Sequence, residues 1–179
     1  MLLNTKGGQA FLALDHRMRA VLENAPMTIA SRLTQLGIKL PKPAAPVAAY
    51  VPTVLAGNLL HVSGQLPFEN GELMRGRLGE DRDVAFGQRA SRACAIMLLA
   101  QIEKALGSLD KVEQVVKLGV FVNSDGRFIE QPAVANGASE LMEQLFGDAG
   151  KHARSAVGVP VLPLGAAVEV DAIVAVRAD

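Results

Sequence analysis

Two charged residues near the C-terminus are of types that can bind an anion and transfer protons. Arg154 carries a planar guanidinium, which can bind a carboxylate through two parallel hydrogen bonds. Glu169 carries a carboxylate, which can hold a water molecule and move protons. If the connection 160–165 turns near its middle, the two residues pair across a hairpin and point to one face of a sheet. A slip of one residue would separate them, and the same pair also fits a purely structural ion pair.

The other reactive residue types do not form a cluster. Cys94 is the only cysteine, so the chain can form neither an intramolecular disulfide nor a cysteine-based zinc site. Its place among Ala and Ile residues predicts a small core residue. The histidines, at positions 16, 61 and 152, lack a metal-ligand spacing such as i and i+4. We therefore expect no metal site.

Composition argues against several classes of partner. Lys plus Arg and Asp plus Glu number 18 each, so no global positive field attracts a nucleic acid, although folding can still create a local basic patch. With no Trp and one Tyr, aromatic platforms for stacking bases are scarce. No apolar run is long enough to span a bilayer, and the N-terminus lacks the pattern of a signal peptide. These features predict a cytoplasmic protein without nucleic-acid or membrane partners.

The elements that position these residues follow from the hydrophobic pattern. Helical spacing predicts a short helix after Thr28, a long helix over 84–106 that ends at Gly107, and another over 133–146. Strand-like runs cover 50–56, 59–63, 72–75, 112–123, 153–159 and 168–176. This order predicts an α+β fold, with a mixed sheet of about six strands and two helices packed on one face.

The length of the chain fits a single domain over residues 27–179. Residues 1–26 are interrupted by Gly7-Gly8 and are interpreted as an N-terminal extension. Either Met27 is the natural start, or the extension forms an extra helix on the surface. Two helices cover only one face of the predicted sheet, and the chain has no third layer for the other face. We therefore expect the chain to form an oligomer.

Three stretches of the chain carry a family likeness. The first reads GNLLHVSGQLP over 57–67, and the second reads VVKLGVFV over 115–122. The third begins with ARSAVGV over 153–159, continues through the Leu-Pro at 162–163 and ends with VEVDA over 168–172. In this order and at this spacing they resemble the Rid/YjgF (reactive intermediate deaminase) family, which is also labelled endoribonuclease L-PSP-like.

The resemblance implies a chorismate mutase-like fold in which three copies form a central barrel with clefts between neighbours. It also implies hydrolysis of small 2-imino acids or their enamines to 2-oxo acids and ammonia, without a metal or an organic cofactor. Arg154 corresponds to the family's carboxylate-binding arginine, and Glu169 corresponds to its water-activating glutamate. Tyr50 and Ser63 correspond to pocket residues, and the backbone at Ala156 corresponds to groups that orient the imine nitrogen and the water.

The chain departs from the deaminase branch of that family at two positions near the arginine. Ala156 stands where that branch has a cysteine, and Gly158 stands where it has an acidic residue, a pair that predicts a roomier pocket. Asn136 lies nearest to the family's pocket asparagine, without a clean alignment. These differences leave a second hypothesis open, a non-catalytic protein that binds a small carboxylate. A ribonuclease is disfavoured, because the chain is neutral, poor in aromatic residues and without paired histidines.

Overall fold

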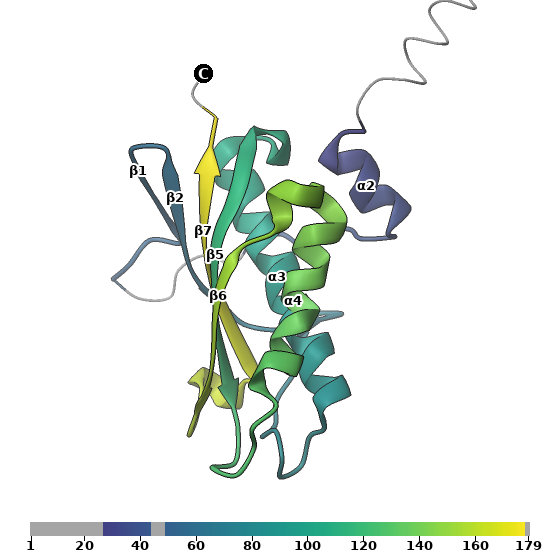
Figure 1. Ribbon diagram of the computed structural model, residues 1–179, viewed down its shortest axis with the longest axis vertical. Coiled ribbons are helices and arrows are strands. Elements are labelled where there is room, and N and C mark those ends of the chain that lie inside the picture. The colour runs from purple at the N-terminus through teal and green to yellow at the C-terminus, as the bar shows by residue number, and fades with distance from the viewer. Residues whose placement is uncertain (1–26, 44–48, 178–179) are drawn as a thin grey trace, which may run out of the picture.

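The computed structural model describes residues 27–43 and 49–177, and the predicted N-terminal extension lies outside these ranges. Its main sheet has five strands in the order β1-β2-β7-β5-β6, with two long helices on one face (Figure 1). The strands are β1 (Thr53–Ala56), β2 (Leu59–Gln65), β5 (Val112–Asn123), β6 (Ala153–Val159) and β7 (Val168–Val176). A separate hairpin pairs β3 (Phe68–Glu69) with β4 (Glu72–Leu73). The predicted α+β class is confirmed, although the run predicted at 72–75 contributes to this hairpin and not to the main sheet.

Two of the helices follow residues whose side chains cap a helix, and the longest one ends at a glycine. Helix α2 (Ile29–Gln35) follows Thr28, whose hydroxyl accepts a hydrogen bond from the Ser31 amide at 3.2 Å. Helix α3 (Val84–Leu106) follows Asp83, whose carboxylate accepts one from the Phe86 amide at 2.8 Å. It ends at Gly107, where φ is +78°, as the sequence predicts. Helix α4 spans Gln131–Phe146.

Helices α3 and α4 approach each other closely at a glycine. A side chain at Gly137 would overlap the backbone carbonyl of Gln88, so only glycine fits this contact without movement. Nearby, a side chain at Gly87 would collide with Val134. The side-chain amide of Gln88 donates a hydrogen bond to the Ala133 carbonyl at 3.1 Å. Glycine costs a helix about 1 kcal/mol relative to alanine. In α4 that cost is offset by the close packing of the two helices.

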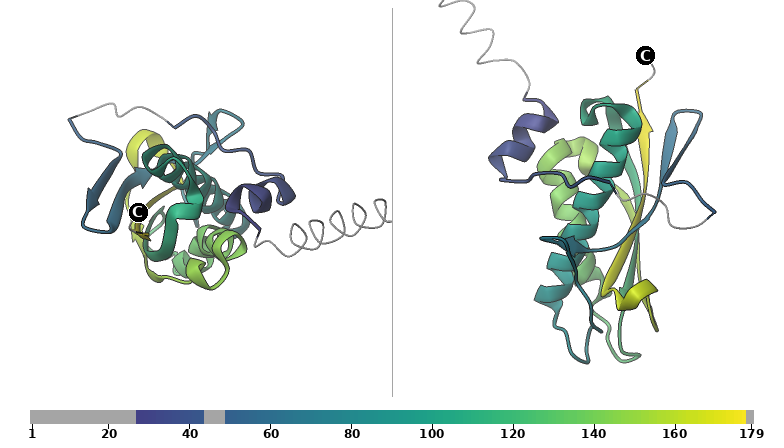
Figure 2. Two further views of the ribbon diagram at one scale, coloured as in Figure 1. Left: turned by 90° about the horizontal axis from the view of Figure 1, so that it is seen from above. Right: turned by 180° about the vertical axis from the view of Figure 1, so that it is seen from behind.

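The two faces of the main sheet differ in burial. Along β7 the buried residues lie under the helices, and the half-buried ones lie on the other face, which we call the open face. The buried set is Val168, Val170, Ala172, Val174 and Val176, and the open-face set is Glu169, Asp171, Ile173 and Ala175. Views from above and from behind place both long helices on one side of the sheet (Figure 2). One face therefore forms the core, as predicted.

The predicted pairing of Arg154 with Glu169 is wrong. Strand β6 pairs in parallel with β5, and β5 pairs antiparallel with β7, so β5 separates the two strands. Arg154 lies beside Leu118 in this register, on the face that the helices cover. Glu169 lies beside Phe121, on the open face. The last two strands follow each other in sequence without forming a hairpin, because β6 arrives at the edge of the sheet through the α4 crossover.

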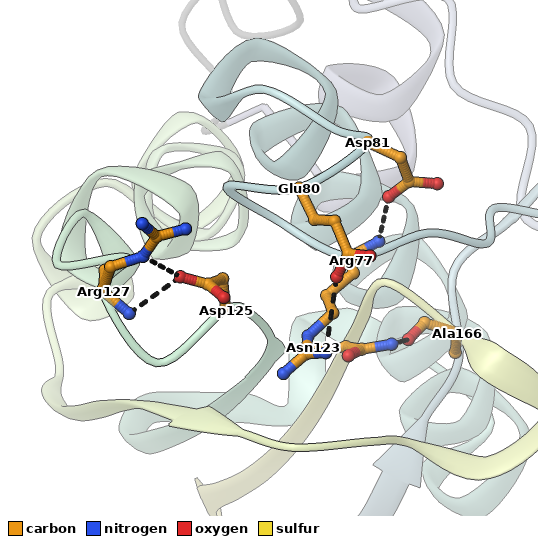
Figure 3. A network of polar contacts seen from close by, with 7 residues as sticks. All are labelled: Arg77, Glu80, Asp81, Asn123, Asp125, Arg127 and Ala166. Carbon is orange, nitrogen blue, oxygen red and sulfur yellow. Dashed lines mark hydrogen bonds and ion pairs between the residues drawn. The ribbon is translucent and has the colours of Figure 1, made fainter.

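A network of polar contacts fixes the loops at one end of the sheet (Figure 3). The side-chain amide of Asn123, at the end of β5, donates a hydrogen bond at 3.2 Å to the backbone carbonyl of Ala166, in the loop that precedes β7. The Asp125 carboxylate accepts from the Arg127 backbone N–H and Nε, both at 3.0 Å, and Arg77 Nη1 donates to Glu80 at 3.3 Å. Arg127 and the Arg77–Glu80 pair are largely exposed, so these ion pairs add little stability. We assign the network a structural role.

Candidate functional site

The Arg154 side chain is held by three hydrogen bonds to helix α4. Its Nη1 donates to Asn136 Oδ1 at 3.0 Å and to Ser139 Oγ at 2.9 Å, and its Nη2 donates to the Pro132 carbonyl at 3.3 Å. The three partners lie at helical spacing, so they share one face of α4. A half-buried guanidinium with three fixed contacts has little rotational freedom, and its plane is set before any ligand arrives.

These contacts leave part of the guanidinium available. A guanidinium has five N–H donors, and the three bonds to α4 use three of them. The Nε–H and one Nη2–H have no partner among the described residues. A bidentate contact with a carboxylate requires two donors, which is the number that Nε and Nη2 leave. The geometry therefore suits Arg154 for binding an anion of this shape.

A second layer of hydrogen bonds supports Arg154. His152 Nδ1 lies 2.6 Å from the Gly150 carbonyl oxygen, and His152 Nε2 lies 2.9 Å from Ser139 Oγ. Because a carbonyl oxygen only accepts, Nδ1 carries the proton in this contact. In the neutral imidazole Nε2 then accepts from the Ser139 hydroxyl, which itself accepts from Arg154. The chain of bonds links a backbone carbonyl to the guanidinium through two side chains, which the sequence pattern did not reveal.

Removing the middle member of this chain should loosen it. We expect Ser139→Ala to lower the free energy of unfolding by about 1–2 kcal/mol, because two part-buried hydrogen bonds are lost. Urea denaturation measures this change. Ser155→Ala, on the same strand as Arg154 but exposed, is the matched control and should leave the value unchanged. Equal stability of both variants would contradict a supporting role for Ser139.

Glu169 lies on the open face with its carboxylate against a glycine. A side chain at Gly64 on β2 would collide with Glu169 Oε1, so the carboxylate occupies the space that Gly64 leaves free. Asp171 has a similar arrangement on the other side of β7, where its Oδ1 accepts from the Gly119 amide at 3.0 Å. Burial, and then the charge of Asp171, raise the pKa of the Glu169 carboxyl above its usual 4.5. A carboxyl with a raised pKa is better suited to carry a proton near neutral pH.

The raised pKa makes stability depend on pH. Unfolded Glu169 ionises before the folded residue does, so stability falls as pH rises from about 4.5 through the raised pKa and is then constant. We expect Glu169→Gln to remove this fall, so the variant should gain melting temperature relative to the parent at pH 7 and match it at pH 4. Glu113→Gln, an exposed carboxylate on β5, should show no such gain. A gain that does not depend on pH would contradict the assignment.

Tyr50 and Ser63 are connected through the chain that enters β1. Ser63 Oγ donates to the Val51 carbonyl at 2.9 Å, and the Ser63 amide donates to the Pro52 carbonyl at 2.9 Å. The Tyr50 side chain is exposed, and Ser63 is followed directly by the glycine that contacts Glu169. Ser63 therefore lies on the Glu169 side of the sheet, together with Gly64 and Asp171, and Tyr50 lies in the segment that leads into the neighbouring strand β1.

Ala156 and Gly158 follow Arg154 on the helix-covered face of β6. Ala156 packs against the core, while a side chain at Gly158 would collide with Ser124 Oγ and the Gln131 amide. The expectation of a roomier pocket is wrong at Gly158, because two polar side chains occupy the space above it. These side chains, from the start of α4 and from the loop after β5, continue the polar groups around β6 beyond Arg154.

The remaining candidates are set aside by their surroundings. Cys94 is fully buried, as predicted, and burial raises the pKa of its thiol well above the usual range, which disfavours the reactive thiolate. Within residues 27–43 and 49–177, no three His, Cys, Asp or Glu side chains gather as a metal would need. In the same ranges no helix is both long enough and apolar enough to cross a membrane.

Comparison with known proteins gives consistent matches over most of the chain. A family model described as YjgF/chorismate mutase-like, putative endoribonuclease, matches residues 30–175. Protein TCP17 of Trypanosoma cruzi is 56% identical over 148 residues, which cover 82% of this chain and 92% of that protein. A 2-iminobutanoate/2-iminopropanoate deaminase of Dermatophagoides farinae is 28% identical over 142 residues, which cover 78% and 95% of the two chains.

Solved structures share the fold. A protein of unknown function from Agrobacterium tumefaciens is 49% identical, with a TM-score of 0.78, covering 83% of this chain and 92% of that chain. The structure of TdcF from E. coli with bound serine is 25% identical, with a TM-score of 0.53, covering 76% and 94% of the two chains. The resemblance seen in three sequence stretches therefore extends through the fold.

Proposed function

Since the chain belongs to the YjgF/chorismate mutase-like family, we propose that it hydrolyses small 2-imino acids to 2-oxo acids and ammonia. The observation that carries the proposal is the state of Arg154, whose side chain is fixed by three hydrogen bonds to α4 and keeps two donors for a ligand. A relative whose name describes the same reaction, and a related structure with a bound amino acid, support this substrate class. Arg154 binds the substrate carboxylate and orients the adjacent imine carbon.

Glu169 supplies the proton transfers in this proposal. A water oxygen bonds to the imine carbon while Glu169 takes a proton from the water and passes it to the imine nitrogen, which leaves a hydroxyl and an amino group on one carbon. Glu169 then takes the hydroxyl proton and passes it to the amino nitrogen, so the carbon–nitrogen bond breaks, the carbonyl of the 2-oxo acid forms and ammonia leaves. The raised pKa of Glu169 supports both directions of transfer. The hydroxyl of Ser63, the ring of Tyr50 and the backbone at Ala156 contribute to the pocket wall.

The positions of these residues favour a site shared between copies. Arg154 lies on the helix-covered face of the edge strand β6, whereas Glu169 lies on the open face, with β5 between their strands. One copy cannot direct both side chains at one small molecule. The other edge of the sheet is β1, which follows Tyr50. We propose that the copies assemble as a ring of three, which brings the β6 side of one to the Glu169 side of the next.

The test uses two variants that should each be inactive. The 2-imino acid is generated from serine by a dehydratase and trapped with semicarbazide, and the protein should slow the formation of the semicarbazone. Arg154→Ala and Glu169→Gln should each abolish this effect. When the two variants are unfolded together and refolded, about a quarter of the clefts should regain both residues, because each cleft draws them from different copies.

The outcomes separate the parts of the proposal. Absence of hydrolysis by the folded wild-type oligomer would exclude the deaminase. Hydrolysis that is not restored by mixing the variants would show that both residues act from one copy. Ala156 favours one alternative function, a carboxylate-binding protein without catalysis, because the deaminase branch of the family has a cysteine there. Stabilisation by 2-oxo acids, lost in Arg154→Ala and without imine hydrolysis, would support that alternative.

A further inference from the structure

A concave site lies on the far side of α3 from the sheet. It is a groove of about 710 Å³ between the segment 37–42 that follows α2, the β3–β4 hairpin and α3, and we call it the outer groove. The segment after α2 runs past the outer side of α3 (Figure 2). A volume of this size is typical of sites that bind small organic molecules.

The outer groove has an apolar floor and wall. Ile96 and Met97 of α3 form part of its floor, and Ile38 and Pro41 line one side. On the opposite side Phe68, in the hairpin, keeps 39% of its surface exposed. An aromatic side chain left exposed beside an apolar floor can bury further apolar surface, at about 25 cal/mol per Å². This floor favours a ligand with an apolar tail.

The rim of the outer groove is positively charged. Lys39 and Lys42 lie on one side and Arg89 and Arg92 on the α3 side, against a single carboxylate, Glu69. This concentration of charge contrasts with the chain as a whole, where acidic and basic residues are equal in number.

The rim charges are poorly neutralised. Arg89 and Glu69 are 3.9 Å apart and both largely exposed, so their ion pair is weak. Arg92 donates to the neutral amide of Gln144 at 3.2 Å, which leaves its charge uncompensated. No ion pair of Lys39 or Lys42 occurs within the described residues. A positive rim above an apolar floor is complementary to a molecule that has an anionic head and an apolar tail.

We propose that the outer groove binds small amphipathic anions, with the tail on the α3 floor and a carboxylate or phosphate head at the basic rim. This site does not depend on the function proposed for Arg154, because its residues are different. Its rim is a local basic patch, which folding can create although the net charge of the chain is zero.

The test measures binding of decanoate and decyl phosphate to the full chain by calorimetry, below the concentrations at which they form micelles. Three further compounds serve as controls in the same experiment. Acetate lacks the apolar tail, decanol lacks the negative charge, and decyltrimethylammonium carries a positive charge on the same tail. We expect the two anions to bind, acetate not to bind, and decanol and the cation to bind at least about threefold more weakly, as rim charges are worth little each. Binding should weaken at high salt. The preferred anion identifies the head group.

Three variants locate the binding. Lys39→Gln combined with Lys42→Gln should weaken decanoate binding by about threefold to tenfold. Phe68→Ala should weaken decanoate binding by a similar factor. Lys104→Gln combined with Arg127→Gln removes the same charge elsewhere and should have no effect. Arg154→Lys should also leave decanoate binding intact. The proposal is overturned if neither anion binds, if decanol or the cation binds as well as decanoate, or if Arg154→Lys abolishes binding while the groove variants do not.

Discussion

Replacing Arg154 with lysine should weaken the binding of a 2-oxo acid by roughly tenfold to a hundredfold. Lysine keeps the positive charge but loses the planar fork, so one charge-assisted hydrogen bond, worth about 1.5–3 kcal/mol, is lost. Lysine also cannot reproduce the three bonds to α4 that fix the side chain. Calorimetric titration with 2-oxobutanoate, on wild type and variant, measures the change in Kd.

The control for this prediction is Arg127→Lys, which makes the same substitution at an arginine that is 92% exposed and paired with Asp125. It should bind 2-oxobutanoate like the wild type. Circular dichroism and urea denaturation check that both variants are folded. If Arg154→Lys binds the acid normally, charge alone suffices at this position and the bidentate contact is not formed.

A single methyl group at Gly137 should destabilise the fold. Alanine is better than glycine inside a helix by about 1 kcal/mol, so Gly137→Ala would normally stabilise α4. Here the methyl would overlap the Gln88 backbone carbonyl, which cannot rotate away as a side chain can. Separating α3 from α4 costs core packing, and we expect a net loss of about 1–3 kcal/mol in the free energy of unfolding. Urea denaturation measures it.

Gly126 provides the matched comparison. It lies in the loop after β5, and a side chain there would meet nothing within 4 Å. Gly126→Ala should change the free energy of unfolding by less than about 0.5 kcal/mol. If Gly137→Ala is instead more stable than wild type, the two helices have room to adjust, and the close contact is not a constraint on the fold.

The periodicity of the sequence predicted most of the elements. The apolar stripe at helical spacing over 84–106 predicted α3, and the glycine that follows predicted where α3 ends. Both signals depend only on residues that are close in sequence. The strand-like run over 168–176 predicted β7, whose alternate residues face the core. The family likeness in three short stretches predicted the fold class, which the solved structures of relatives confirm.

The sequence could not predict the neighbours of β6. Residues 153–159 lack a clear alternation, and the short connection to β7 favoured a hairpin that does not exist. Parallel pairing with β5 depends on a crossover through α4, which is non-local information. Of the partners of Arg154 on α4, Asn136 was named only through the family resemblance, and Ser139 was missed. Their role becomes apparent once α4 is placed against β6.

The edge position of β6 also affects how the molecule opens locally. Strand β6 has a strand partner on one side only, whereas β5 and β7 each pair on both sides. An edge strand can separate while the antiparallel part of the sheet, which contains β1, β2, β7 and β5, stays intact. We therefore expect the arginine-bearing strand to lose its protection from hydrogen exchange before the central strands do. A locally opened molecule would then keep most of its core, while its binding residue had lost its supports.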